Sequence, residues 1–315
     1  MGVMIDGKWH TQSIAELADG GSFKRSETSF RNWVTADGEF PAQAGRYHLY
    51  VSLACPWAHR TLIMRALKGL EDKISVSVVN WFMGDDGWSF DNGDGVVPDP
   101  FFSASHLRDV YASAKPDYTG RVTVTVLLDT KTEQIVSNES AEIIRMFNSA
   151  FDGVGAEPGD YYPAALRDEI DTVNARVYST LNNGVYKSGF ARTQKAYERA
   201  VLPLFDTLDW MEDILSRQRW LAGDQFTEAD IRAFVTLIRF DHVYHGHFKC
   251  NRARIVDYPN LWAYTRDIYQ RPGVAETVDL GHIRNHYYAS HETVNPTRIV
   301  AVGPVLDYMA PHGRG

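Results

Sequence analysis

One cysteine in the stretch VSLACPWAHR, residues 51–60, stands where a thiol can act as a nucleophile. The residues before Cys55 are typical of a strand and Pro56 suits the first turn of a helix, so the thiol is expected at a helix N-terminus. Unpaired backbone N–H groups and the helix dipole stabilise a thiolate there and make it reactive near neutral pH. A dithiol redox motif would have its second cysteine three positions on, where this chain has Ala58. From position alone, a small buried cysteine at a turn is an equally good interpretation.

Two other residues bear on the role of this thiol. His59 follows Cys55 by one helical turn and would support a thiolate if it were protonated, but an ordinary position on the helix surface is the favoured interpretation. Cys250, in the stretch HFKCNRARI, has no flanking motif and is predicted to be structural.

A second motif that could bind a ligand is SNESAE, residues 137–142, which opens a predicted helix. An amino-acid-like zwitterion fits such a position, because its carboxylate can accept hydrogen bonds from backbone N–H groups and the Ser140 hydroxyl while Glu139 pairs with its ammonium group. Taken by itself, the motif is better explained by helix capping through Ser137 or Asn138.

The elements that position both motifs follow the order β-α-β-insertion-β-β-α, which is the order of a thioredoxin-type domain. β-Branched runs predict the strands and apolar residues at helical spacing predict the helices. The strands are expected at residues 47–54, 74–82, 121–129 and 133–137, the helices from Pro56 to Gly69 and over 138–151, and a turn-rich insertion at 81–119. A thiolate at one helix N-terminus and a zwitterion site at another, in this order of elements, suggest one ligand with both ends, which is glutathione.

The remaining sequence predicts a second, all-helical domain. The expected divisions are an N-terminal extension (1–46), an α/β thioredoxin-like glutathione-binding domain (47–150), a Gly- and Pro-rich linker (151–163), an all-helical substrate domain (164–290) and a C-terminal tail (291–315). In the stretch FTEADI, Thr227 is expected to cap a helix near Asp230.

Composition limits the partners and the compartment. The 315 residues have a formal net charge of −8, which argues against a nucleic acid or an anionic membrane as partner because both require a basic surface, and a small ligand is expected. Two cysteines cannot form a disulfide framework. No signal peptide, myristoylation signal or membrane span is evident, and we expect a reduced, soluble, cytoplasmic protein.

Several motifs together resemble the glutathionyl-hydroquinone reductases, the Xi class of the glutathione transferase superfamily. The resemblance extends from about Phe30 to Gly303 and depends on the segments SLACPWAHR, NWFMGDDGWSF, DVYASAKPDYTGRVTV, IVSNESAEIIRMFN, RFDHVYHGHFKCN and HIRNHYYASHETVNPTRIV. It implies a thioredoxin-like domain followed by an all-helical domain, a class-specific homodimer, glutathione as co-substrate and no metal.

The resemblance also implies roles for individual residues. Cys55 is expected to be the nucleophile. Glutathione is expected to bind Trp88, Arg121, the backbone of Val124, Glu139 and Ser140. Tyr186, Tyr244 and Tyr287 match the tyrosines that face the aromatic substrate in that family, although in a chain with 16 tyrosines any three on helices would usually be packing residues.

One position departs from the family pattern. Glutathione transferases typically have a cis-proline after the valine whose backbone binds glutathione, and this chain has Thr125 there. A cis bond before a residue other than proline costs roughly 2.5–4 kcal/mol. We therefore expect a trans Val124–Thr125 bond, which would turn the Val124 backbone away from glutathione.

The resemblance predicts glutathione-dependent reduction of S-glutathionyl-hydroquinones to hydroquinones. Cys55 would take the glutathionyl group as a mixed disulfide, and a second glutathione would resolve it to oxidised glutathione. An Omega-like thiol transferase or dehydroascorbate reductase is one alternative, and a non-catalytic binding protein with the transferase fold is another.

Overall fold

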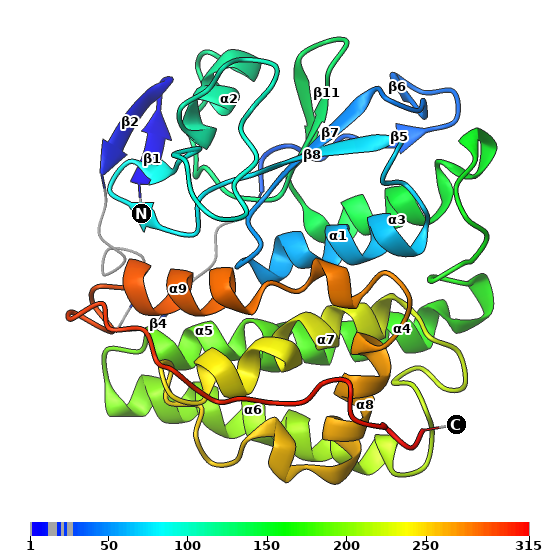
Figure 1. Cartoon of the computed structure of the whole chain (residues 1–315), viewed down its shortest axis with the longest axis vertical. Helices are drawn as coiled ribbons and strands as arrows, with labels where there is room; N and C mark the ends of the chain where they lie inside the picture. Colours follow the sequence, from blue (N-terminus) through cyan, green and yellow to red (C-terminus); the bar gives the residue numbers. More distant parts are fainter. Residues whose placement is uncertain (1, 12–17, 20–21, 24–27, 315) are drawn as a thin grey trace. The chain divides into compact units, whose positions relative to one another are not determined.

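The computed structural model describes residues 2–11, 18–19, 22–23 and 28–314 (Figure 1). The described residues form two compact units. The first consists of residues 2–11, 28–159 and 277–286, and the second of residues 18–19, 22–23, 160–276 and 287–314. Of the N-terminal extension expected at 1–46, residues 1, 12–17, 20–21 and 24–27 lie outside the described residues.

A four-stranded sheet forms the core of the first unit, in the order β12-β11-β7-β8. The strands are β7 (Tyr47–Val51), β8 (Ile74–Val78), β11 (Val126–Asp129) and β12 (Gln134–Ser137). β7 pairs in parallel with β8, and β11 pairs antiparallel with both β7 and β12. Every residue of β7 is buried, as is typical of a central strand covered on both faces.

Helices α1 (Pro56–Leu67) and α3 (Ser140–Ser149) pack against each other along one face of this sheet, as Figure 1 shows. The thioredoxin-like order of strands and helices predicted from the sequence is confirmed. The insertion adds elements that the sequence did not predict, namely β9 (Met83–Gly84), β10 (Gly87–Trp88) and α2 (Leu107–Ala114).

N-terminal residues of the first unit add short strand pairs and a segment along one edge of the sheet. Short pairs are formed by β1 (Gly2–Ile5) with β2 (Lys8–Thr11) and by β5 (Val34–Thr35) with β6 (Phe40–Pro41). Residues 30–32 run beside the edge strand β12: the Asn32 N–H donates to the Val136 carbonyl at 2.9 Å, and the Asn138 N–H donates to the Phe30 carbonyl at 3.1 Å. The described N-terminal segment therefore supplies hydrogen bonds that β12 would otherwise lack.

The second unit is helical apart from the short pair β3 (Ala18–Asp19) and β4 (Ser22–Phe23). Its helices are α4 (Arg167–Arg176), α5 (Gly184–Gly189), α6 (Gln194–Leu215), α7 (Glu228–Arg239) and α8 (Pro259–Tyr269), with π-helical turns η4 (Val177–Asn182) and η5 (Phe240–Tyr244). Residues of α9 (Leu280–Ser290) belong to both units. The 3₁₀ turns are η2 (Asp152–Val154), η3 (Ala164–Leu166), η6 (Ile255–Asp257) and η7 (Ala275–Thr277).

The start of α7 shows why this helix begins where it does. The Thr227 hydroxyl accepts a hydrogen bond from the Ala229 N–H at 3.3 Å, and the Asp230 carboxylate accepts one from the Thr227 N–H at 2.8 Å. The cap predicted at Thr227 is confirmed. In the part of the chain that is described, no helix is long and apolar enough to cross a membrane.

Candidate active site

Cys55 lies at the N-terminus of α1, directly after strand β7. Its backbone is extended (φ −78°, ψ 122°), and Pro56 occupies the first turn of the helix. The half-buried thiol lies 3.9 Å from the carbonyl oxygen of Val124, with Sγ as the donor. The sulfur therefore stands where backbone N–H groups at the start of a helix favour a negative charge.

His59 is not on the helix surface, so that prediction was wrong. Its side chain is fully buried, and Nε2 lies 2.8 Å from the Thr277 hydroxyl. The physical reason is that α1 is covered on almost every side, so that Arg60 and Thr61, which resemble a solvent-facing stretch in the sequence, are also buried.

The Val124–Thr125 peptide bond is cis, which contradicts the expected trans bond. That expectation weighed only the local preference of the bond. The surrounding fold holds the chain on both sides: the Tyr111 hydroxyl donates to the Thr123 carbonyl at 2.9 Å, and Val126 pairs with Tyr50 in the sheet. The argument against a glutathione contact at Val124 therefore fails.

Glu139 caps helix α3. Its Oε1 accepts a hydrogen bond from the Ala141 N–H at 3.0 Å, and Ser140 is the first, buried residue of the helix. Capping by Ser137 or Asn138 was therefore the wrong alternative: the Ser137 hydroxyl accepts from the Glu139 N–H, and the Asn138 amide contacts Phe30 and Tyr111 instead. The other carboxylate oxygen, Oε2, accepts a long hydrogen bond of 3.4 Å from the Thr28 hydroxyl. A carboxylate oxygen has two lone pairs, so Oε2 can also receive a ligand cation.

Trp88 and Arg121 are positioned by different parts of the first unit. Trp88 is largely buried in β10 and stacks on His286, with ring centroids 4.9 Å apart. Half-buried Arg121 follows Gly120, whose N–H and carbonyl each bond to Met4 at 2.9 Å. Of the predicted glutathione residues, Cys55 and Val124 are thus brought into contact, and Glu139 and Ser140 are adjacent at one helix start.

The three predicted substrate tyrosines come together within the second unit. The Tyr287 hydroxyl lies 2.5 Å from that of Tyr186 and 2.9 Å from that of Tyr244. Tyr244 and Tyr287 are buried, whereas Tyr186 is half-buried. Burial raises the pKa of both Tyr244 and Tyr287 well above the usual value, and the neighbouring Tyr186 adds to this effect. The phenols therefore keep their protons at neutral pH and can donate hydrogen bonds.

Two aromatic residues beside these tyrosines were missed at the sequence level. Phe248 stacks on Tyr244 with ring centroids 5.6 Å apart, and Phe190 stacks on Tyr186 at 6.3 Å. Each phenylalanine follows its tyrosine by four residues, the spacing that places two side chains on one face of a helix. That spacing was the signal that could have found them.

Cys250 is more deeply buried than Cys55 and does not lie at the start of a helix. It is fully buried, and burial raises the pKa of its thiol to about 12. A thiol in that state is a poor nucleophile, as expected for a structural residue. Among the described residues, no group of three or more His, Cys, Asp or Glu side chains could hold a metal ion.

A thioredoxin-like sheet with a cysteine at the first helix, followed in the chain by a helical unit, defines the class of glutathione transferases. The family models for the glutathione S-transferase N-terminal and C-terminal domains match residues 54–150 and 194–267. Glutathionyl-hydroquinone reductase YqjG from Escherichia coli is 57% identical, with 100% of this chain and 98% of the relative covered. Glutathionyl-hydroquinone reductase PcpF from Sphingobium chlorophenolicum is 58% identical, with 96% of each chain covered.

Solved structures agree with these relatives. The glutathione-bound structure of YqjG from Escherichia coli K-12 matches with a TM-score of 0.93 at 55% identity, covering 99% of each chain. A Xi-class glutathione transferase from Natrialba magadii also has a TM-score of 0.93, at 50% identity, covering 100% of this chain and 96% of the other. The chain belongs to the glutathionyl-hydroquinone reductase family, the Xi class of glutathione transferases.

Proposed function

We propose that this protein reduces S-glutathionyl-hydroquinones to hydroquinones at the expense of glutathione. The observation that carries the proposal is Cys55, a half-buried thiol at the start of α1 with no second cysteine in its motif. The names of the two curated relatives, identical to this chain at 57% and 58% of positions, support the same activity.

The proposed reaction has two steps. After the ring carbon that carries sulfur takes a proton by tautomerisation, the Cys55 thiolate attacks the glutathionyl sulfur. The carbon–sulfur bond breaks, its electron pair restores the aromatic ring, and a Cys55–glutathione disulfide forms. A second glutathione thiolate then attacks this disulfide, releasing oxidised glutathione and the Cys55 thiolate. One ring–sulfur bond is thus reduced, and two glutathione sulfurs, one from the substrate thioether and one from the free thiol, are oxidised to the disulfide.

The other residues have roles that match their chemistry. The Val124 backbone, Trp88, Arg121, Glu139 and Ser140 are proposed to bind glutathione, with Glu139 pairing with its ammonium group. The tyrosines 186, 244 and 287 are proposed to bind the ring oxygens and assist proton transfer at the ring, for which protonated hydroxyl groups are suited.

Four further properties are part of the proposal. The protein is proposed to act in the cytoplasm as a homodimer, without a metal, with glutathione bound by residues 47–150 and the aromatic substrate by residues 164–290, joined by a linker at 151–163. The two cysteines, which cannot form a disulfide framework, support the compartment. Membership of the Xi class supports the homodimer. The chemistry of a thiol nucleophile supports the absence of a metal.

Steady-state kinetics are expected to be ping-pong, because the hydroquinone leaves before the second glutathione enters. Initial rates measured over a grid of glutathionyl-hydroquinone and glutathione concentrations should give parallel double-reciprocal lines. Converging lines would indicate direct attack by a bound glutathione and reject the Cys55 intermediate. Turnover of a simple mixed disulfide but not of a glutathionyl-hydroquinone would favour the Omega-like alternative.

Glu139→Gln is expected to raise the KM for glutathione by roughly ten- to a hundredfold, the equivalent of a charge-assisted hydrogen bond of about 1.5–3 kcal/mol. The amide oxygen can still accept from the Ala141 N–H, so helix α3 keeps its cap. Glu142→Gln is the matched control, because Glu142 lies in the same helical turn and pairs with Arg31. An unchanged KM in Glu139→Gln would reduce Glu139 to a helix cap.

A further inference from the structure

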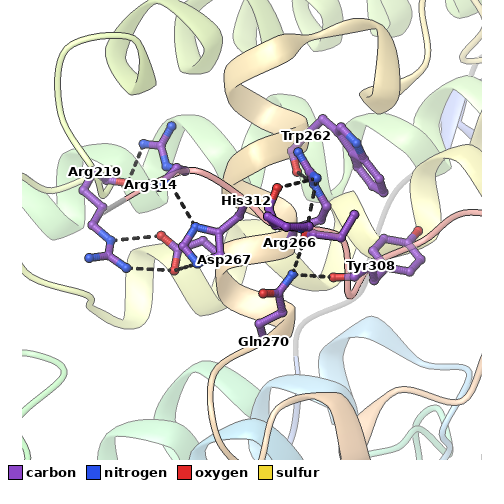
Figure 2. A network of polar contacts seen from close by, with 10 residues as sticks. Arg219, Trp262, Arg266, Asp267, Gln270, Tyr308, His312 and Arg314 are labelled. Carbon is purple, nitrogen blue, oxygen red and sulfur yellow. Dashed lines mark hydrogen bonds and ion pairs between the residues drawn. The ribbon is translucent and has the colours of Figure 1, made fainter.

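The C-terminal segment, residues 304–314, is held in place by side chains of the second unit. The Gln270 amide donates to two carbonyl oxygens of the segment, those of Tyr308 and Ala310, each at 2.8 Å. Figure 2 shows the bond between Gln270 and Tyr308. Arg314 donates to two carbonyl oxygens that follow α6, each at 2.9 Å. These contacts hold the segment at Tyr308 and at the residues that follow it.

Tyr308 brings a hydroxyl group into the interior of the unit. Its ring is buried against Trp262 and Tyr269, with ring centroids 5.2 Å and 5.1 Å away. The hydroxyl oxygen lies 3.0 Å from Nε2 of His242, which is itself buried. Burial raises the pKa of Tyr308, so the hydroxyl stays protonated.

His242 belongs to the π-helical turn η5, two residues before Tyr244. The carbonyl of His242 also accepts a hydrogen bond from the Tyr288 hydroxyl at 3.5 Å, and Tyr288 is next to Tyr287 in α9. π-Helical turns are rare and occur frequently at functional sites. The side chain and the carbonyl of His242 are each held by a contact from outside this turn. A hydrogen bond to His242 therefore restrains the same turn that carries Tyr244 and its hydroxyl.

We propose that Tyr308 and His242 are positioning residues: the C-terminal segment, through the Tyr308–His242 hydrogen bond, holds η5 so that the Tyr244 hydroxyl keeps its place beside Tyr287. This inference rests on the proposed function, in which these hydroxyls bind the ring of the substrate. It predicts that the contact affects the step involving the aromatic ring and leaves the exchange of disulfides at Cys55 unchanged.

Tyr308→Phe is the test, because it keeps the ring packing and removes the hydroxyl. Reduction of S-glutathionyl-hydroquinone should fall in kcat by about two- to tenfold, the equivalent of one hydrogen bond, while reduction of bis(2-hydroxyethyl) disulfide keeps its kcat and KM. Tyr269→Phe is the matched control, since Tyr269 contacts the same ring but makes no hydroxyl hydrogen bond among the described residues. Equal losses on both substrates, or no loss on either, would overturn the proposal.

Two further measurements separate this inference from the proposed function. His242→Phe should match Tyr308→Phe, and the double variant should be no worse than either single variant, whereas additive losses would contradict coupling. In both single variants, amide hydrogen exchange at His245 should be faster than in the wild type. The His245 N–H donates to the Phe240 carbonyl at 2.8 Å and closes the turn. If the wild type does not reduce the glutathionyl-hydroquinone at all, the proposed function fails, and exchange in residues 240–245 alone supports or rejects the positioning role.

Discussion

Cys55→Ala is expected to lower the reduction of glutathionyl-hydroquinones by about a thousandfold or more, because no other group in the motif can form the covalent intermediate. The fold should be retained. The thiol is half-buried, and its contact with the Val124 carbonyl is a weak one of 3.9 Å. Thermal unfolding of wild type and variant would show whether stability is preserved while activity is lost.

Intact-protein mass spectrometry can follow the intermediate directly. With less than one equivalent of substrate, the wild type should gain one glutathione and Cys55→Ala none. Cys250→Ala is the control, and it should keep both activity and adduct because its thiol is buried with a pKa of about 12. A glutathione adduct on Cys250 would contradict the assignment of the nucleophile.

The largest expected effect on stability is that of Asp230→Ala. This buried carboxylate accepts hydrogen bonds from the Leu221 N–H at 2.9 Å, the Thr227 N–H at 2.8 Å and the Tyr264 hydroxyl at 2.7 Å. Alanine would leave all three donors in the interior without this acceptor. The free energy of unfolding should fall by about 3–5 kcal/mol, measured by urea denaturation.

Two comparisons test the cause of that loss. Asp230→Asn keeps one oxygen acceptor and should lose less stability than the alanine variant. Asp213→Ala removes an exposed carboxylate near the end of α6, whose partner Arg217 lies just beyond the helix, and should change stability little. If Asp230→Ala were no less stable than Asp213→Ala, the capping network at α7 would not stabilise the fold as described.

The thioredoxin-like order was predictable because its strands and helices have clear local periodicity. The apolar and aromatic residues of YHLYV predict a buried strand, and in the structure this strand lies inside the sheet, between β11 and β8. Helix α2 and the pair β9–β10 were not predicted, because their turn-rich surroundings mask any period. The π-helical turns were missed for another reason: a change in hydrogen-bond register inside a helix leaves little trace in hydrophobic spacing.

Some features of the candidate site could likewise be predicted from the sequence, and others could not. The position of Cys55 at a helix start follows from a strand and a proline on either side of it. The burial of His59 and the conformation of the Val124–Thr125 bond depend on tertiary contacts, and local reasoning got both wrong. The tyrosines at 186, 244 and 287 come from three separate segments, so no local pattern joins them; the family resemblance pointed to them, and the structure brought their hydroxyl groups together.

The backbone bonds between residues 30–32 and strand β12 have a practical consequence for any shortened form of the protein. The matched N-terminal family domain begins at residue 54, and a chain cut there would also lose β7, the central strand at Tyr47–Val51. A cut just before residue 46 would keep β7 but leave the edge of β12 open to pairing with another chain. Aggregation during expression is the expected result, so fragments for crystallisation or fusion should begin no later than residue 28.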